Sequence, residues 1–291
     1  MIKEIYMPFK GYKTYIRIVG SEYKKTPLIL LHGGPGSTHN SEELLDDMSI
    51  KDKRPLIMYD QLGCGLSPCD DIELLKPSVW IEELETIVKY LNLAKYHLLG
   101  HSWGGMLLIM YLCDKERDDC ISAILSSTLS SAKLWAKESK QFIRQLSKED
   151  RKIIKDTEKS GNYDSKEYKE VLDRYYKICV FDRPVENSPE CLRRVKPKTL
   201  SYDVWGKSEF HPTGELKNYE YTDKLKYIKV PTLILSGEKD ESTPKQNNLM
   251  YRKIKAYKEQ YIFKGSRHMT YYESHDLYEE KVINFLNKVD E

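Results

Sequence analysis

The stretch at residues 98–105, LLGHSWGG, constrains what this chain can fold into more than any other. An apolar run at residues 96–99 leads into it and another at residues 106–112 follows it. The GHSWG of residues 100–104 fits G-x-S-x-G, a tight strand-to-helix turn that presents its serine in a strained, exposed position. Glycines suit such a turn because a Cβ would clash with nearby backbone. An ordinary βα turn fits the same five letters, so the interpretation of Ser102 as a nucleophile depends on partners elsewhere in the chain.

Strand-like and helix-like segments alternate on both sides of this turn. Apolar or alternating runs predict strands at residues 13–19, 27–31, 55–59, 96–99, 121–125, 231–236 and 260–263. Helical spacing of apolar residues predicts helices at 79–91, from Ser102 to about 113, and at 276–289. This alternation is typical of a mostly parallel sheet with helices on both faces, the α/β class.

The pattern changes after Ser131. From residue 132 to residue 194 the chain shows helical segments and no convincing strand, and this character continues to about Tyr227. We therefore expect a core domain made of residues 1–130 and 228–291, interrupted by a helical cap domain at residues 131–227.

The composition of this 291-residue chain excludes several classes of protein. A net charge of +2, with 47 basic residues interleaved among 45 acidic ones, gives no footprint for nucleic acid. No apolar run approaches the length of about 18 residues that a membrane span needs, and the N-terminus is charged too early for a secretory signal. The six cysteines show neither a C-x-x-C pair nor zinc spacing, which indicates reduced thiols. We predict a cytoplasmic protein without nucleic-acid or membrane partners, and leave its oligomeric state open, a monomer included.

A serine nucleophile needs a base, and the base needs an orienting carboxylate. On a sheet of this kind the three follow in the order Ser, Asp or Glu, His. Of the seven histidines, only His268 and His275 come after a plausible acid-bearing strand. His268 lies in a loop directly after the last strand, whereas His275 lies in the first turn of a helix, so we predict His268 as the base. Asp240 is the predicted acid; Glu238 and Glu241 are alternatives, and acids here are also typical of a helix start.

A glycine-rich loop, HGGPG at residues 32–36, follows an early strand. Such a loop can direct a backbone N–H at the oxygen of a reacting carbonyl group. We predict an oxyanion hole formed by the backbone N–H groups of Gly34 and Trp103. A phosphate-binding loop is disfavoured because neither G-x-G-x-x-G nor the P-loop lysine pattern is present. The predicted chemistry requires no cofactor and no metal.

These motifs resemble the α/β-hydrolase superfamily and, within it, the prolyl iminopeptidase family of serine aminopeptidases. The resemblance rests on HGGPG at 32–36, DQLGCGLS at 60–67, GHSWGG at 100–105, GEKDE at 237–241 and GSRH at 265–268. It implies the α/β-hydrolase fold with a helical cap inserted into it. It also implies removal of the N-terminal residue, often proline, from short peptides; the similar tricorn-interacting aminopeptidase accepts a wider range of residues.

In this family two glutamates hold the free α-amino group of the substrate. The resemblance places these roles on Glu241 and on Glu209; for Glu209 the alternative is a surface residue of the cap. A carboxylate pair in a partly dry cleft favours an ammonium group and disfavours a blocked terminus. Preference for proline needs a small apolar pocket, for which Trp103, Trp205 and Phe210 are candidates that could also be core residues. The alternatives are a carboxylesterase or lactonase on the same scaffold, and a binding protein without turnover.

Overall fold

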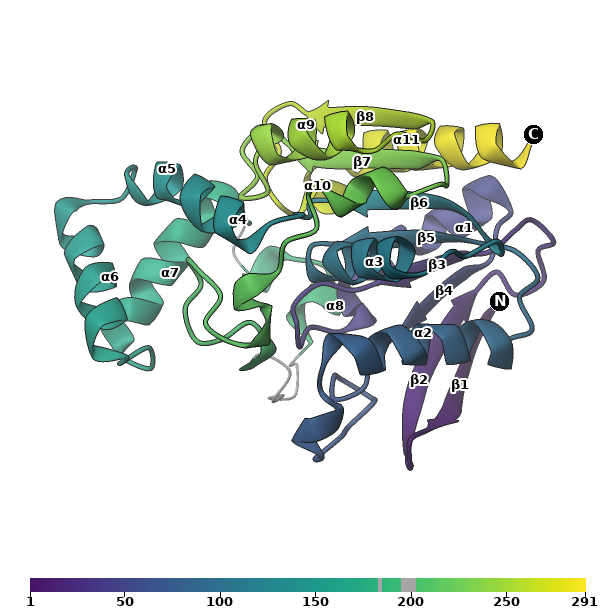
Figure 1. The fold of residues 1–291 in the computed structure, drawn as a ribbon, viewed down its shortest axis with the longest axis horizontal. Coiled ribbons are helices and arrows are strands. Elements are labelled where there is room, and N and C mark those ends of the chain that lie inside the picture. The colour runs from purple at the N-terminus through teal and green to yellow at the C-terminus, as the bar shows by residue number, and fades with distance from the viewer. Residues whose placement is uncertain (183–184, 195–202) are drawn as a thin grey trace.

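An eight-stranded sheet runs through the middle of the molecule, as Figure 1 shows. The computed structural model describes residues 1–182, 185–194 and 203–291. The spatial order of the strands is β1-β2-β4-β3-β5-β6-β7-β8; β2 pairs antiparallel with β1 and β4, and every later pairing is parallel. The predicted α/β class with a mostly parallel sheet is therefore confirmed. The strands are β1 (Ile2–Phe9), β2 (Tyr12–Val19), β3 (Leu28–Leu31), β4 (Leu56–Tyr59), β5 (Tyr96–His101), β6 (Cys120–Ser126), β7 (Thr232–Gly237) and β8 (Lys258–Phe263).

The central strands are short and apolar because helices cover both of their faces. Every residue of β3, β4 and β5 is buried. The edge strand β1 is not among the predicted strands. It forms a hairpin with β2 through Lys10 and Gly11, whose φ angles of 47° and 85° match the left-handed turns that two-residue hairpins prefer. The Lys10-Gly11 pair before the predicted strand is the signal that could have located β1.

Two layers of helices enclose the sheet. On one face lie α2 (Pro77–Tyr90), α3 (Trp103–Asp114) and α9 (Pro244–Lys253), whose apolar side chains share one buried cluster with the strands. On the other face lie α1 (Asp46–Asp52) and α11 (His275–Asp290), together with the short α10 (Thr270–Glu273). Within the described ranges, none of the helices has the length and apolarity to cross a membrane.

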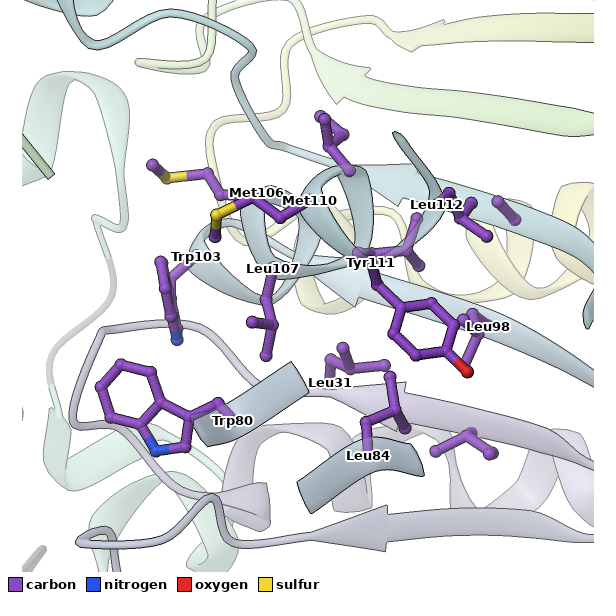
Figure 2. Close-up of a cluster of buried hydrophobic side chains, with 14 of the residues drawn as sticks. Leu31, Trp80, Leu84, Leu98, Trp103, Met106, Leu107, Met110, Tyr111 and Leu112 are labelled. Carbon is purple, nitrogen blue, oxygen red and sulfur yellow. The ribbon is translucent and has the colours of Figure 1, made fainter. Parts of the chain in front are cut away.

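Helix α3 is apolar on all sides because it lies between the sheet and neighbouring helices. All residues from Trp103 to Leu112 are buried. Figure 2 shows Leu107 and Tyr111 of this helix directed toward Leu84 and Leu31. The indole of Trp103 meets that of Trp80 edge to face, with ring centroids 5.4 Å apart. This packing fixes the first turn of α3, at which Ser102 lies.

The segment between β6 and β7 is helical, and in Figure 1 it projects beyond one end of the sheet. It has an apolar cluster of its own, which includes Ile154, Tyr175 and Phe210. Part of this segment, residues 183–184 and 195–202, lies outside the described residues. The described part contains helices and 3₁₀ turns but no strand. The division into domains at residues 130 and 228 remains a proposal. The helices are α4 (Ala132–Glu138), α5 (Lys140–Ile143), α6 (Lys148–Ser160), α7 (Lys166–Cys179) and α8 (Glu190–Arg193).

Candidate active site

Ser102 occupies a strained turn between β5 and α3. Its φ of 54° and ψ of −118° lie in a region that residues with a Cβ rarely adopt. Close packing around the turn requires glycine on both sides. A Cβ on Gly100 would lie 2.4 Å from the carbonyl oxygen of Gly104, and one on Gly104 would lie 2.0 Å from that of Leu31. The surroundings therefore hold the serine backbone in a conformation that raises its side chain out of the turn, and such strain is typical of functional sites.

Asp240 and His268 meet at the same end of the sheet, although 28 positions separate them in the chain. Asp240 follows β7 and is fully buried, and His268 follows β8. Asp240 Oδ1 is 2.8 Å from Nδ1 of His268, and the same oxygen accepts a hydrogen bond of 2.7 Å from the N–H of Ser242. Donation from Nδ1 leaves Nε2 of His268 as the basic nitrogen.

The loop that bears His268 lies against the turn that bears Ser102. The rings of His101 and His268 have centroids 4.8 Å apart, and Nε2 of His101 donates to the carbonyl oxygen of His268 at 3.2 Å. On the other side, a Cβ built on Gly33 would lie 3.4 Å from Cβ of Ser102. The loops after β3, β5 and β8 therefore converge, because parallel strands end at the same edge of their sheet. That Ser102, Asp240 and His268 act together stays a prediction.

Gly34 and Trp103 lie on two sides of Ser102. Gly34 lines the same cavity as Ser102 and has a φ of +122°, and a Cβ there would lie 2.5 Å from the N–H nitrogen of Gly36. Trp103 is the first residue of α3, so its backbone N–H is one of the four at that terminus without an acceptor in the helix. The two residues flank the serine as an oxyanion hole requires, and their role as donors remains a prediction.

The side chain of Gln61 connects these two loops by hydrogen bonds, a role that the sequence patterns do not predict. Its Nε2 donates to the carbonyl oxygen of His32 at 3.2 Å, and its Oε1 accepts from the indole of Trp103 at 2.8 Å. Its backbone N–H also donates to Nε2 of His32 at 3.0 Å. Gln61 is fully buried, so these hydrogen bonds form without competition from water. Gln61 of the DQLGCGLS motif at residues 60–67 thus links the HGGPG loop to Trp103 through hydrogen bonds.

Replacing Gln61 with leucine is expected to lower kcat for an aminoacyl-arylamide by roughly 10- to 100-fold, with a smaller change in KM. The substitution leaves the backbone of both predicted donor loops in place but removes the hydrogen bonds that hold their spacing, and small misplacements cost rates of this order. Steady-state kinetics measure the effect. Gln260→Leu, on β8, is the matched control and should leave kcat unchanged; equal losses in the two variants would contradict a positioning role.

A cavity of about 610 Å³ opens above Ser102. The loops of the sheet and the helical segment both contribute to its wall. Of the three residues suggested for an apolar pocket, only Trp205 lines it. Trp103 packs against Trp80, and Phe210 packs against Tyr175 in the core of the helical segment, with ring centroids 5.0 Å apart. The apolar and aromatic residues that line the cavity are Pro35, Leu129, Trp135, Tyr163, Leu172, Tyr176 and Trp205.

Two acidic side chains, Glu209 and Glu241, line this cavity together with Ser102. Glu209 is partly buried and its Oε2 accepts a hydrogen bond of 2.6 Å from the hydroxyl of Tyr176. Glu241 is 6% exposed, and its Oε2 is buried without a hydrogen-bond partner among the described residues. Burial raises the pKa of both carboxyl groups. The hydrogen bond from Tyr176 partly offsets this for Glu209, and the proximity of His268 partly offsets it for both. A cationic group in the cavity would relieve this cost, and so the pair favours a positively charged ligand.

The third predicted acid, Glu238, lies away from the cavity. It is exposed, and its Oε2 accepts a hydrogen bond of 2.9 Å from the N–H of Gly265. Among the three acids of this loop, Asp240 makes the contact with Nδ1 of His268. The geometry therefore favours Asp240 over Glu238 as the orienting group and leaves Glu241 facing the other nitrogen.

One group in the described part of the chain has the make-up of a metal site, and it lies outside the cavity. Ligand atoms of Asp47, His275 and Glu279 lie within 4.8 Å of one another. The ammonium group of Lys51 is 2.8 Å from Asp47 and 2.5 Å from Glu279. Lys51 already supplies a positive charge to both carboxylates, which makes an ion-pair network the simpler account of this cluster.

Comparisons with known proteins find relatives that are similar over almost the whole chain. A family model described as alpha/beta hydrolase fold matches residues 26–275. The proline iminopeptidase of Lactobacillus helveticus is 46% identical over 289 residues, 98% of both chains, and that of Clostridioides difficile is 47% identical over 293 residues, 99% of both chains. Among solved structures, the proline iminopeptidase of Mycobacterium smegmatis has a TM-score of 0.88 at 26% identity, and VinJ has one of 0.90 at 25%; each alignment covers 99% of both chains.

Both kinds of similarity extend over almost the whole chain, including the helical segment between β6 and β7. The five motifs at residues 32–36, 60–67, 100–105, 237–241 and 265–268 lie in the loops at one end of the sheet, where members of this superfamily carry their nucleophile elbow and its partners. The chain belongs to the α/β-hydrolase superfamily and, within it, to the proline iminopeptidase family.

Proposed function

We propose that this protein is a serine aminopeptidase that releases the N-terminal residue, proline above all, from short peptides with a free N-terminus. The observation that carries this proposal is the cavity in which Ser102 lies together with the carboxylates of Glu209 and Glu241. An exopeptidase must recognise a charged ammonium group at a fixed distance from the bond that it cleaves. Relatives named proline iminopeptidase, 42–47% identical over nearly their full length, support the same activity.

In this proposal, Nε2 of His268 accepts the proton of Ser102 as its Oγ attacks the carbonyl carbon of the first residue. The N–H groups of Gly34 and Trp103 stabilise the oxyanion, and His268 then donates the proton to the leaving amine. Water attacks the resulting ester by the same route and releases the N-terminal amino acid. Asp240 holds His268 in the required tautomer and stabilises its imidazolium form.

The substrate's end lies, in this proposal, between Glu209 and Glu241. Aromatic rings from the helical segment, such as Trp205 and Tyr176, form an apolar wall beside it. A prolyl ring is compact and apolar apart from its nitrogen, which suits a pocket with aromatic walls and an acidic end. Because the cap segment forms much of the wall, we propose that it restricts entry to short peptides, and the division into core and cap has its functional meaning here.

The test compares proline-arylamide with its N-acetyl derivative. We expect acetylation to lower kcat/KM by roughly 10³-fold or more, because it removes the cation and leaves two buried carboxylates without a partner. Hydrolysis is followed by the release of the coloured amine. A carboxylesterase or lactonase would instead cleave esters without regard to the amine. Equal rates for the two arylamides would exclude the aminopeptidase, and absence of turnover with either, or with esters, would favour a binding protein.

A further inference from the structure

The carboxylate of Glu241 lines the cavity and also lies close to His268. Its Oε1 is 3.8 Å from Nε2 of His268, the nitrogen that must be unprotonated to serve as the base. Its backbone N–H is held at 3.3 Å by the carbonyl oxygen of Cys179, which in turn accepts from the N–H of His268 at 3.1 Å. The carbonyl group of Cys179 thus holds the backbones of Glu241 and His268 close together, and their side chains face each other.

Among the described residues, several titratable groups face His268. Asp240 and Glu241 face it from the loop after β7, Glu209 from the helical segment, and the ring of His101 from the end of β5. Burial by itself would lower the pKa of His268, but the three carboxylates outweigh it and raise this pKa to about 9. Burial raises the pKa of Glu241, and the facing imidazolium offsets this, so each group favours the charged form of the other across the 3.8 Å contact. A His268 held in its imidazolium form cannot accept a proton from Ser102.

We propose that Glu241 couples recognition of the substrate to activation of the catalytic base: in the empty site its carboxylate stabilises a protonated His268, and a bound substrate ammonium takes over that carboxylate and releases the proton. This inference rests on the function proposed above and adds regulation to the same site. The N–H bond at Nε2 breaks, the proton passes to water, and the lone pair becomes available to Ser102. No other bond changes.

The coupling follows from the exchange of one cation for another. An ammonium between Glu209 and Glu241 neutralises the charge that favoured the imidazolium, and its own positive charge disfavours a second cation nearby. Both effects lower the pKa of His268, whereas Asp240 keeps its hydrogen bond to Nδ1 throughout. A molecule without an ammonium group could enter the cavity and still meet an inactive base. A blocked peptide would therefore bind more weakly and, once bound, would also react more slowly.

The decisive measurement is the titration of His268 by NMR in ¹⁵N-histidine-labelled protein, with and without prolinol. Prolinol carries the prolyl ammonium but no carbonyl group to attack. We expect a pKa near 9 in the free protein and a value at least one unit lower at a prolinol concentration that fully inhibits hydrolysis of proline-arylamide. In Glu241→Gln, the pKa without prolinol should already be at least one unit lower. Glu238→Gln removes a carboxylate from the same loop and should titrate like the original protein.

Kinetics give an independent readout. The rate at which a neutral fluorophosphonate labels Ser102 reports the base in the free enzyme, and kcat reports it in the substrate complex. The labelling rate should rise about tenfold per pH unit until the pH reaches the pKa of His268 in the free enzyme. The rise of kcat with pH should end at least one pH unit lower, at the pKa of His268 in the substrate complex. The coupling alone would be overturned if the labelling rate and kcat rose over the same pH range. It would also be overturned if prolinol left the pKa of His268 unchanged in a protein that hydrolyses the arylamide. No hydrolysis, or no inhibition by prolinol, would instead overturn the proposed function.

Discussion

Replacing Ser102 with alanine is expected to lower kcat/KM for proline-arylamide by roughly 10⁴- to 10⁶-fold. In the proposed mechanism the hydroxyl of Ser102, directly before α3, supplies the nucleophile. Loss of the nucleophile in a serine hydrolase leaves only the catalysis that the oxyanion hole and binding can provide. The variant should fold normally, because alanine meets the same backbone restriction as serine at a φ of 54°.

The matched control is Ser127→Ala. Ser127 is a buried serine directly after β6 with a φ of 50°, and it does not line the cavity above Ser102. This variant should retain the rate within about twofold, since surrounding contacts stay intact. A fluorophosphonate probe, read by peptide mass spectrometry, should label Ser102 in the original protein and in the control. Turnover by Ser102→Ala above one tenth of the original rate would refute the acyl-enzyme mechanism.

Replacing Asp240 with asparagine is expected to lower kcat by about 10⁴-fold with little change in structure. The carboxylate accepts the proton at Nδ1 of His268, and an amide in its place can donate there instead, which stabilises the tautomer that lacks a basic Nε2. The substitution also removes the largest of the charges that raise the pKa of His268. The loss should therefore appear in kcat across the whole pH range rather than only on its acid side.

Glu238→Gln tests whether any carboxylate of this loop would have the same effect. Its side chain accepts a hydrogen bond from the N–H of Gly265 at 2.9 Å, which the glutamine oxygen can preserve, so activity should be unchanged. Thermal unfolding of both variants distinguishes a chemical defect from a folding defect. If Asp240→Asn kept most of its activity while Glu241→Gln lost it, the orienting role would belong to Glu241, 3.8 Å from Nε2 of His268.

Much of the sheet could be predicted from the sequence because its central strands have little freedom. The runs that become β3 and β4 are short, apolar and bounded by polar residues, a pattern that is typical of strands buried on both faces. The edge strand β1 escaped prediction because its residues are mostly exposed, which weakens the hydrophobic signal. The register of β1 with β2 follows from the turn at Lys10 and Gly11 rather than from burial.

The candidate site divides in the same way. Ser102, Asp240 and His268 could be proposed from the sequence, because each comes directly after a predicted strand and such positions meet at one edge of a parallel sheet. The residues that form the wall of the cavity could not be predicted from the sequence. Trp205 and Phe210 are similar apolar residues close together in sequence, yet one lines the cavity and the other packs inside the helical segment. Periodicity does not separate them because no regular helix among the described residues carries either one.

The sequence by itself determined the class of fold, the order along the chain of the strands after β1, and the loops that carry the predicted chemistry, since these depend on local patterns of apolar residues, glycines and charges. The tertiary structure alone decided the distances between those loops. It brought Glu241 to 3.8 Å from the second nitrogen of His268, and it joined the HGGPG loop to Trp103 through Gln61. Interactions of this kind depend on how separate strands and loops pack against each other, and no pattern within one segment encodes the distance to another.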